Sequence, residues 1–397
     1  MFDRGKLHRL QRALRPHLAD GWERAVFAAP QTDGAARDER VVAGPGAGRA
    51  PSAADVDALL AAAGDAAGAG LVKQTVVLDA RRRVQVDARH GRASVRTLDE
   101  AAALKVMGGK ERSLRPDTSA ALLREIGIMN ADGSISATHA RKYKQISHLA
   151  TLCEPTIERL ATTRPLTAEA PLRALDLACG NAYLSFVLAE VLRLRGVPLR
   201  LHGVDVRADV VARSAERATH LGLAGLSFAQ ADIAGAAASA PAVLGGPPDL
   251  VLALHACDTA TDEAIALAIR LGVPALLSVP CCQAEIAAQL AGHKAEGAHP
   301  LAALLEHGLL RRAYADVLTD GIRVAALEAC GYDVTVVEFV GSEHTAKNLL
   351  IRAHRRHPRA PVEPSRWRLA PLVARCEALG IAPDLLARLA EPASAHS

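Results

Sequence analysis

The stretch RALDLACGNAYLS, residues 173–185, decides the fold. An apolar strand pattern ends at Asp176, passes through small residues and enters a helical pattern. Gly180 stands at the turn, and Ala178 and Ala182 take flanking positions where glycine is commoner. Small residues allow a ligand to approach the backbone, and the N-terminus of a helix presents free N–H groups. Because G-x-G-x-x-G is absent, the stretch is not the dinucleotide fingerprint.

Strand and helix patterns alternate from this stretch onward, which predicts βαβ units and a largely parallel sheet. The strand patterns lie at 172–178, 199–205, 249–255 and 274–280, and the helical patterns at 183–195, 208–221, 260–271 and 283–291. Two more apolar runs, Asp333–Val340 and Asn348–Ala353, are expected to pair as a hairpin at a sheet edge. Between Cys281 and Gly331 we expect helices and no strand, with helices at Leu301–Glu306 and Tyr314–Ala329. These helices are expected to cover the carboxyl ends of the strands.

The length of 397 residues suggests two or three domains, and composition divides the chain into four segments. Residues 1–100 are predicted to form a small α+β domain. Its helices are expected at Arg4–Leu18 and Ser52–Ala63, and its three antiparallel strands at Gln74–Asp79, Arg83–Asp87 and Ala93–Thr97. Residues 101–165 are expected to be a helical linker or cap, with helices at Leu122–Met129 and His139–Ala161. Residues 166–357 are expected to form the main domain, and residues 358–397 a helical tail.

Asp176 and Asp205 end the first two strand patterns, and Asp232 follows a third, shorter one within FAQADI, residues 228–233, so that the patterns at 249–255 and 274–280 are the fourth and fifth. Ligands of open α/β sheets bind at the carboxyl ends of the strands. A carboxylate at the second tip can hold both ribose hydroxyls, and one at the third can accept a hydrogen bond from an adenine amino group. The set fits S-adenosylmethionine better than NAD. The alternative is that these acids only cap helices.

Residues 172–233 resemble the core of the class I S-adenosylmethionine-dependent methyltransferases. The later motifs are more specific: HACDTATD (255–262), SVPCCQ (278–283), LTDGIR (318–323) and EHTAKNL (343–349), with KYKQI (142–146) upstream. Together they resemble one methyltransferase family. It includes uncharacterised bacterial proteins, the glutathione-S-transferase C-terminal-domain-containing proteins and the tRNA 2′-O-methyltransferases that act near the acceptor stem. The likeness covers about residues 105–353.

This resemblance implies an α/β fold with a Rossmann-like, seven-stranded class I methyltransferase sheet and S-adenosylmethionine as cofactor. The cofactor-binding residues expected on this basis are Asp176, Ala178, Gly180, Asn181, Asp205, Asp232, Lys142 and Gln145. Lys142 and Gln145 lie one turn apart on a predicted helix, so an exposed polar stripe is the alternative. The tRNA enzymes have Gly and His where this chain has Asp258 and Gln283, and they carry zinc-finger segments that are not visible here.

Polar and thiol side chains follow the fourth and fifth strand patterns, where adjacent parallel strands bring them together. The candidate catalytic residues are His255, Cys257, Asp258, Cys281 and Cys282, with Asn348 at the start of the last strand. In the first hypothesis His255 is the general base. In the others a cysteine is a nucleophile, His255 and the cysteines bind zinc, or the cysteines only pack. We predict the first, without a metal.

A basic segment that contains an aromatic residue suggests RNA, tRNA or rRNA, as the acceptor. It comprises Arg352, His354, Arg355, Arg356, His357, Arg359, Arg366, Trp367 and Arg368. The alternative is that this segment is only a solvated, arginine-rich surface. Two other functions also remain possible: methylation of a protein or small molecule, and a non-catalytic scaffold. The net charge of +4 decides nothing alone. Seven cysteines, no secretory signal and no run of 18 apolar residues predict a cytoplasmic protein without disulfides or membrane contact.

Overall fold

The computed structural model describes residues 4–30, 38–254, 256–292, 301–338, 349–358 and 366–390. The chain divides into two compact units, Met1–Ser147 and His148–Ser397, which are treated separately below. The boundary falls inside one long helix, α5 (Ala137–Thr163). The division into four segments, with boundaries after residues 100, 165 and 357, is finer than these two units and stays a prediction.

The N-terminal unit is built on a five-stranded antiparallel sheet in the order β2-β1-β3-β4-β5. The strands are β1 (Arg24–Ala28), β2 (Glu39–Ala43), β3 (Lys73–Val77), β4 (Arg82–Asp87) and β5 (Arg92–Thr97). The last three were predicted, whereas β1 and β2 were missed. The remaining helices are α3 (Glu100–Val106) and α4 (Ala120–Glu125).

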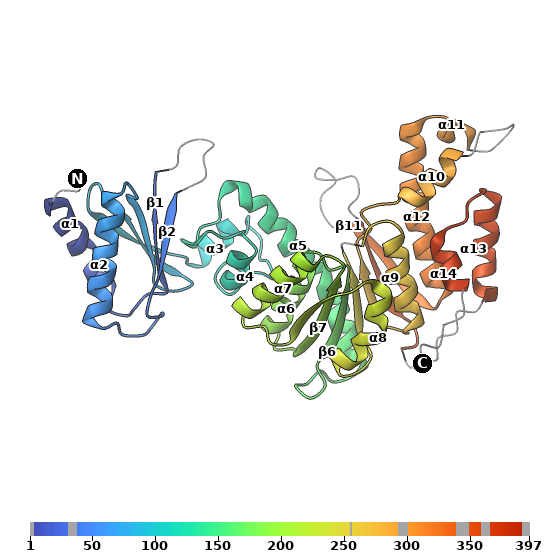
Figure 1. The fold of residues 1–397 in the computed structure, drawn as a ribbon, viewed down its shortest axis with the longest axis horizontal. Coiled ribbons are helices and arrows are strands. Elements are labelled where there is room, and N and C mark those ends of the chain that lie inside the picture. Colours follow the sequence, from blue (N-terminus) through green and yellow to red (C-terminus); the bar gives the residue numbers. More distant parts are fainter. Residues whose placement is uncertain are drawn as a thin grey trace. The chain divides into compact units, whose positions relative to one another are not determined.

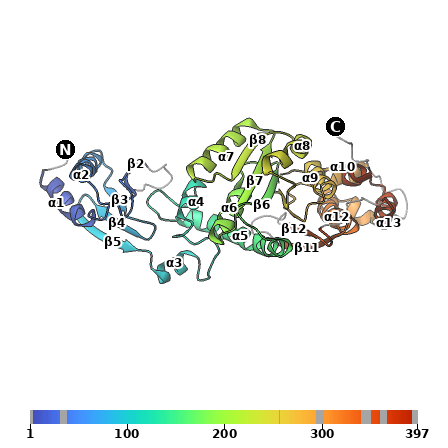
Figure 2. The ribbon, with the colours of Figure 1, turned by 90° about the horizontal axis from the view of Figure 1, so that it is seen from below.

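Helices α1 (Arg4–Leu14) and α2 (Ala53–Gly68) cover one face of that sheet (Figure 2). Leucines of both helices pack against apolar residues that alternate along the strands, such as Val76 and Val84. Ser52 caps α2, since its hydroxyl accepts from the Asp55 N–H at 3.1 Å while the Asp55 carboxylate accepts from the Ser52 N–H. On the opposite face, the register places Arg83 and Gln85 of β4 beside the buried Val77 and Thr75 of β3.

The C-terminal unit contains a seven-stranded sheet in the order β11-β12-β10-β9-β6-β7-β8. Its strands are β6 (Leu172–Leu177), β7 (Leu199–Asp205), β8 (Leu226–Gln230), β9 (Leu250–Ala253), β10 (Ala275–Ser278), β11 (Tyr332–Glu338) and β12 (Leu349–Arg355). Strand β12 is antiparallel to both of its neighbours, and the other pairs that join β10, β9, β6, β7 and β8 are parallel. The predicted Rossmann-like α/β sheet and its edge hairpin are confirmed.

Helices cover both faces of this sheet, with α6 and α7 on one side and α8, α9 and α12 on the other (Figure 1). Their bounds are α6 (Tyr183–Leu194), α7 (Ala208–His220), α8 (Ile233–Leu244), α9 (Thr259–Arg270), α10 (Ala284–Gly292), α11 (Ala302–Leu305), α12 (Gly308–Ala329), α13 (Arg366–Ala378) and α14 (Asp384–Ala390). Between β10 and β11 the described residues are helical or irregular, as predicted. No helix in the described ranges is long and apolar enough to cross a membrane.

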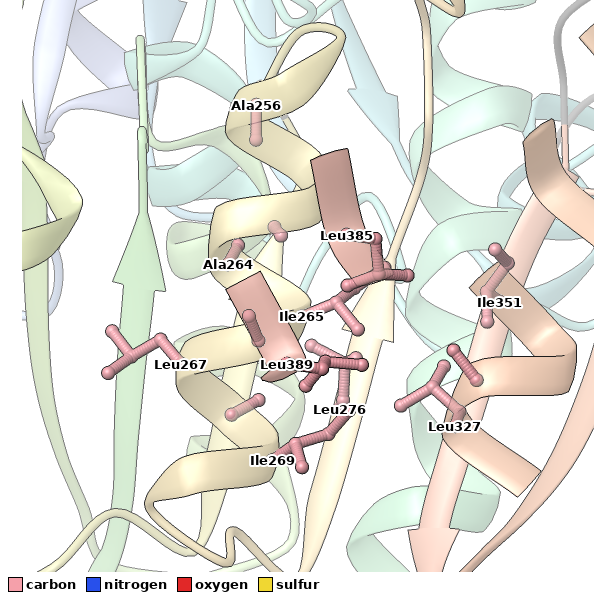
Figure 3. Close-up of a cluster of buried hydrophobic side chains, with 14 of the residues drawn as sticks. Ala256, Ala264, Ile265, Leu267, Ile269, Leu276, Leu327, Ile351, Leu385 and Leu389 are labelled. Atoms are coloured by element: carbon pink, nitrogen blue, oxygen red, sulfur yellow. The ribbon is translucent and has the colours of Figure 1, made fainter. Parts of the chain in front are cut away.

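The core of this unit gathers around α9 (Figure 3). Ile265 and Ile269 of α9 meet Leu276 of β10, Leu327 of α12 and Leu385 of α14, all of them buried. Burying a side chain of this size stabilises the folded state by about 1.5–3 kcal/mol. The apolar contacts therefore fix α12 beside the start of α9, where the candidate catalytic residues lie.

Candidate functional site

The turn after β6 adopts left-handed backbone conformations at alternate positions. The φ angles are 52° at Ala178, 55° at Gly180 and 53° at Ala182. Glycine adopts this conformation freely, but an alanine in it is strained because its Cβ crowds the backbone. The sequence had marked the two alanines as positions where glycine is commoner, and the structure gives the reason. Small side chains here keep the backbone open to a ligand.

Asp176, the last acid of β6, is buried beside this turn. Its Oδ2 accepts a hydrogen bond of 2.5 Å from the Ser185 hydroxyl, while its Oδ1 is buried without a hydrogen-bond partner among the described residues. Burial raises the pKa of Asp176 to about 7, against the opposing effect of Ser185, and the nearby charge of Asp205 adds to the rise. The carboxyl group is thus able to accept a hydrogen bond from a cationic or polar ligand.

Asp205 ends β7 and has its carboxylate occupied by protein donors. Oδ2 accepts from the Gly180 N–H at 2.8 Å, and Oδ1 accepts from the backbone N–H and the Nε of Arg207, both at 3.0 Å. Although burial opposes ionisation, the bonds from Arg207 and Gly180 outweigh it and lower the pKa of Asp205. The ionised carboxylate connects the turn to the tip of β7, and a ribose would replace the exposed guanidinium of Arg207.

The other expected cofactor residues are placed differently. Asp232 is exposed and caps α8, because its Oδ1 accepts from the Gly235 N–H at 2.7 Å; capping was the alternative that the sequence left open. Asn181 is exposed in the turn. Lys142 and Gln145 lie on α5 within the N-terminal unit, exposed and half-buried respectively. The structure therefore brings Asp176, Gly180 and Asp205 together, and the cofactor-binding roles of all eight residues stay predictions.

These features fit S-adenosylmethionine. The unpartnered Oδ1 of Asp176 can accept a hydrogen bond from the amino group of its methionine part, and Asp205 has the position and charge to accept from ribose hydroxyls. The small residues Ala178 and Gly180 place no long side chain between the turn and a ligand. When bound, the cofactor supplies a methyl group on a sulfonium, which is a strong electrophile.

Three thiols lie together at the tips of β9 and β10. The Sγ–Sγ distances are 3.1 Å for Cys257–Cys281, 3.7 Å for Cys257–Cys282 and 3.9 Å for Cys281–Cys282. All seven cysteines are free thiols, so the three are not joined by a disulfide. Burial and the two neighbouring thiols raise the pKa of Cys281 to about 12. This weakens the hypothesis that Cys281 is a nucleophile, because the thiolate is the reactive form.

The residue after Cys257 is held in a strained conformation. Asp258 has a φ of 54° and a ψ of −122°, a region that L side chains rarely adopt. Its Oδ1 accepts from the Glu285 N–H at 3.0 Å, which bridges the loop after β9 to the start of α10. Its carbonyl accepts from Nη2 of Arg323 at 2.9 Å. These two bonds hold the turn that carries Cys257.

Arg323 is fully buried and joins α12 to both thiol-bearing loops. Its guanidinium donates to both carboxylate oxygens of Asp262, at 2.8 and 3.1 Å, and to Asp320 at 3.1 Å. Asp320 in turn accepts from the side-chain amide of Gln283, the residue after Cys282, at 3.2 Å. Although burial disfavours the charged guanidinium, the two carboxylates outweigh it and raise the pKa of Arg323. Helix α12 thus reaches the carboxyl ends of β9 and β10, as predicted.

Two candidate catalytic residues, His255 and Asn348, lie outside the described residues, so their predicted roles stay predictions. Helical spacing in the LTDGIR motif predicts only a local i, i+3 ion pair between Asp320 and Arg323, which the structure confirms at 3.1 Å. The partner that matters most, Asp262, is 61 positions away in the sequence. The only signal in the sequence was that Asp320 and Arg323 both belong to the LTDGIR motif.

Comparison with known proteins locates the function in the unit just described. Residues 141–289 match a family model whose description is "Methyltransferase domain". The chain carries a methyltransferase domain. It is therefore an S-adenosylmethionine-dependent methyltransferase, as predicted. No curated protein matches the sequence.

Solved structures with a similar fold are distant. An rRNA methylase from Streptococcus thermophilus matches with 12% identity and a TM-score of 0.32, over 51% of this chain and 94% of that one. The cofactor-bound protein Rv0187 from MTB matches with 16% identity and a TM-score of 0.35, over 65% and 95%. A precorrin-6y C5,15-methyltransferase from Geobacter metallireducens matches with 15% identity and a TM-score of 0.29, over 47% and 80%. Scores of this size say nothing about the acceptor of this methyltransferase.

The basic segment spans the second strand of the edge hairpin and the residues after it, and four of its residues make contacts within the protein, which weakens its use as support for RNA binding. Arg352 donates to the Leu152 carbonyl at 2.8 Å, and Arg355 donates to the Gly272 carbonyl at 3.0 Å. His354 is buried, and burial, with the charges of Arg159 and Arg352, lowers its pKa to about 4. Arg356 is engaged with Asp333 at 3.0 Å. Arg359 and the side chains of Arg366 and Trp367 lie outside the described part of the methyltransferase.

Proposed function

We propose that this S-adenosylmethionine-dependent methyltransferase is a cytoplasmic enzyme that methylates RNA, by direct displacement with a general base. The uneven distribution of charge supports an RNA acceptor. Residues 1–147 contain 24 Lys and Arg against 17 Asp and Glu, whereas residues 148–397 contain 23 against 26. The positive charge that would attract a polyanion therefore lies in the N-terminal unit.

Within that unit, basic side chains gather on the sheet face opposite α1 and α2. The register places Arg83 beside Arg96, and Asp87 between Lys73 and Arg92. Arg92 and Arg96 are exposed, whereas Lys73 is paired with Asp87 at 3.1 Å. A hollow on this face is also lined by hydroxyl and amide groups, those of Thr75, Ser94 and Gln85. Such a surface suits a sugar–phosphate backbone, and phosphate contacts require no particular base.

The observation that carries the proposal is a small cavity in the N-terminal unit, of about 150 Å³. Five arginines line it, Arg24, Arg81, Arg82, Arg83 and Arg124, against two aspartates, Asp79 and Asp132. One guanidinium nitrogen of Arg24, Nη2, is buried without a hydrogen-bond partner among the described residues. Burial, together with the charge of Arg24, lowers the pKa of Arg124. An anionic group of phosphate size would satisfy both guanidinium groups.

The proposed reaction assigns a role to each part of the C-terminal unit. Asp176 and Asp205 bind and orient the cofactor, and the buried Arg323 network fixes the loops at the tips of β9 and β10. The acceptor oxygen or nitrogen attacks the methyl carbon in line with the leaving sulfur. We assign the proton lost by the acceptor to His255, from its position after the fourth strand. No covalent enzyme–substrate adduct forms.

The decisive experiment is incubation of the enzyme with methyl-labelled S-adenosylmethionine and total cellular RNA, protein and small-molecule fractions. Label is expected in RNA and should be lost on nuclease treatment. RNA affinity should fall steeply with salt, because each neutralised phosphate releases counterions. Label confined to the protein or small-molecule fraction would assign the other acceptor class and remove the RNA proposal.

Charge reversal tests the surface itself. Arg92→Glu/Arg96→Glu should weaken RNA binding and reduce the slope of log affinity against log salt. Arg4→Glu/Arg12→Glu is the matched control, because it makes the same charge change on exposed residues of α1, which covers the other face of the sheet. Equal losses in the two variants would mean that only net charge matters. Calorimetric affinity for S-adenosylmethionine should be unchanged in both.

A further inference from the structure

We propose that Cys257, Cys281 and Cys282 form a zinc site with one open coordination position, at the tips of β9 and β10. This goes beyond the proposed function and does not depend on the acceptor. The sequence prediction involved no metal, since vicinal cysteines are less common zinc ligands than Cys-x-x-Cys. The geometry of the folded chain favours the metal hypothesis that was set aside.

The distances between the sulfur atoms carry this proposal. Ligands about 2.3 Å from zinc at the corners of a tetrahedron are about 3.8 Å apart. The three Sγ–Sγ distances are 3.1, 3.7 and 3.9 Å, so small side-chain movements would place all three sulfurs around one ion. Among the described residues this is the one cluster of three or more His, Cys, Asp or Glu side chains with ligand atoms so close together.

The ligand type selects the metal. Three sulfur ligands are soft and exclude magnesium and calcium, which prefer oxygen. Thiolates on a tetrahedral site are typical of zinc. Cys257 is exposed and the other two are half-buried, so the site is open on one side. A fourth ligand, water or an atom of the acceptor, can therefore reach the ion, as in zinc sites that keep an open position.

The surrounding bonds hold the ligands in place before a metal arrives. Asp258 bridges the Cys257 loop to Glu285, which follows the vicinal cysteines, and Arg323 and Asp320 connect the same two loops through α12. Supporting residues of this kind orient metal ligands and raise the affinity for the ion. The strained backbone at Asp258 is consistent with a functional constraint at this turn.

The test measures metal content of the full chain, purified under reductant without added metal. About one zinc per chain is expected by mass spectrometry, and near zero in Cys257→Ser, Cys281→Ser and Cys282→Ser. Cys330→Ser is the matched control, because Cys330 is a half-buried free thiol outside the cluster, and it should keep its zinc. Circular dichroism and cofactor affinity, measured on each variant, show whether it is folded.

Cobalt provides a second measurement that is independent of activity and of RNA. Titration of the metal-free protein with Co²⁺ should produce thiolate-to-cobalt charge-transfer absorption, displaced by one equivalent of Zn²⁺. Asp258→Ala should weaken zinc about 10–100-fold, and Asp258→Asn, which keeps the acceptor for the Glu285 N–H, should restore most of it.

Two outcomes overturn the proposal. One is a folded, reduced wild-type protein that neither contains zinc nor binds Zn²⁺ or Co²⁺. The other is equal metal binding in the three serine variants and in wild type, which would mean adventitious metal elsewhere on the chain. Either result leaves the methyltransferase assignment untouched, because metal content and metal titration measure neither methyl transfer nor RNA binding.

Discussion

Two regions at the carboxyl edge of one sheet show how the same topology serves different chemistry. At the tips of β6 and β7, carboxylates and a left-handed turn present oxygen atoms and backbone N–H groups, and the contacts are local. At the tips of β9 and β10, three thiols lie in loops that are held by a buried arginine from a distant helix. The first region is suited to hold a cofactor. The second depends on long-range packing for its shape.

The largest expected effect separates turnover from cofactor affinity. His255→Ala should lower turnover by about 10²–10⁴-fold at saturating S-adenosylmethionine, because the acceptor would lose its base. Cofactor affinity should be nearly kept. Cys281→Ser should lose less turnover, since direct displacement needs no thiol. A His255→Ala enzyme with near wild-type turnover would contradict this, and the base would then be sought at Asn348, Lys142 or Gln145.

Removal of the arginine that organises the second region should destabilise the fold. Arg323→Met leaves Asp262 and Asp320 buried without a counter-charge, and loss of one partner of a buried ion pair costs about 3–5 kcal/mol. Urea denaturation measures the change in free energy of unfolding. The control is Arg213→Met, which removes an exposed pair with Asp209 and should cost below about 1 kcal/mol. Similar costs for the two variants would refute the role given to Arg323.

In the first region the expected loss is in binding. Asp205→Ala should weaken S-adenosylmethionine by roughly 10–100-fold, because one charge-assisted interaction is worth about 1.5–3 kcal/mol. Calorimetry on the folded variant tests this, with thermal denaturation to separate binding from the loss of the Gly180 contact. Asp232→Ala should weaken binding less, since that carboxylate is exposed and already caps α8. Unchanged affinity in Asp205→Ala would remove the ribose assignment.

The smallest effect is a dependence of cofactor binding on pH that comes from Asp176 in the first region. Because the pKa of Asp176 is raised to about 7, the free protein holds a proton there at pH 6. A cationic cofactor favours the carboxylate, so binding at pH 6 should release up to one proton, and at pH 8.5 almost none. Calorimetry in two buffers of different ionisation enthalpy counts the protons. Asp176→Asn should show no release at either pH.

The raised pKa of Asp176 also determines how the stability of the folded protein changes with pH. A carboxyl group with a raised pKa binds its proton more tightly in the folded state than in the unfolded one. Its contribution to the free energy of unfolding is therefore full below about pH 4 and is lost as pH rises to about 7. Wild type should lose more stability than Asp176→Asn over this range, in the absence of cofactor. An equal slope for both proteins would contradict the shift.

The sequence predicted what depends on local pattern and on strand order. The alternation around residues 172–205 was enough to place Asp176 and Asp205 at neighbouring tips, and parallel topology was enough to bring Cys257 toward Cys281. It could not show that Arg323 reaches Asp262, because helical spacing gives only the i, i+3 partner. Nor could it show that His354 and Arg355 are buried, since charged and titratable residues in a predicted edge hairpin are expected to be exposed.

The strained turn after β6 has a consequence for motion. Ala178 and Ala182 each bear a left-handed conformation that costs about 1–2 kcal/mol, and local opening of the turn releases that energy. The turn is therefore the segment of the β6 tip that opens most readily, although the strand behind it is buried. In hydrogen-exchange terms, the amides of Cys179, Gly180 and Ala182 are hydrogen-bonded, but they should exchange faster than those of β6 in the free enzyme and slow markedly when the cofactor binds. Cofactor binding would then hold closed a turn whose backbone strain favours opening.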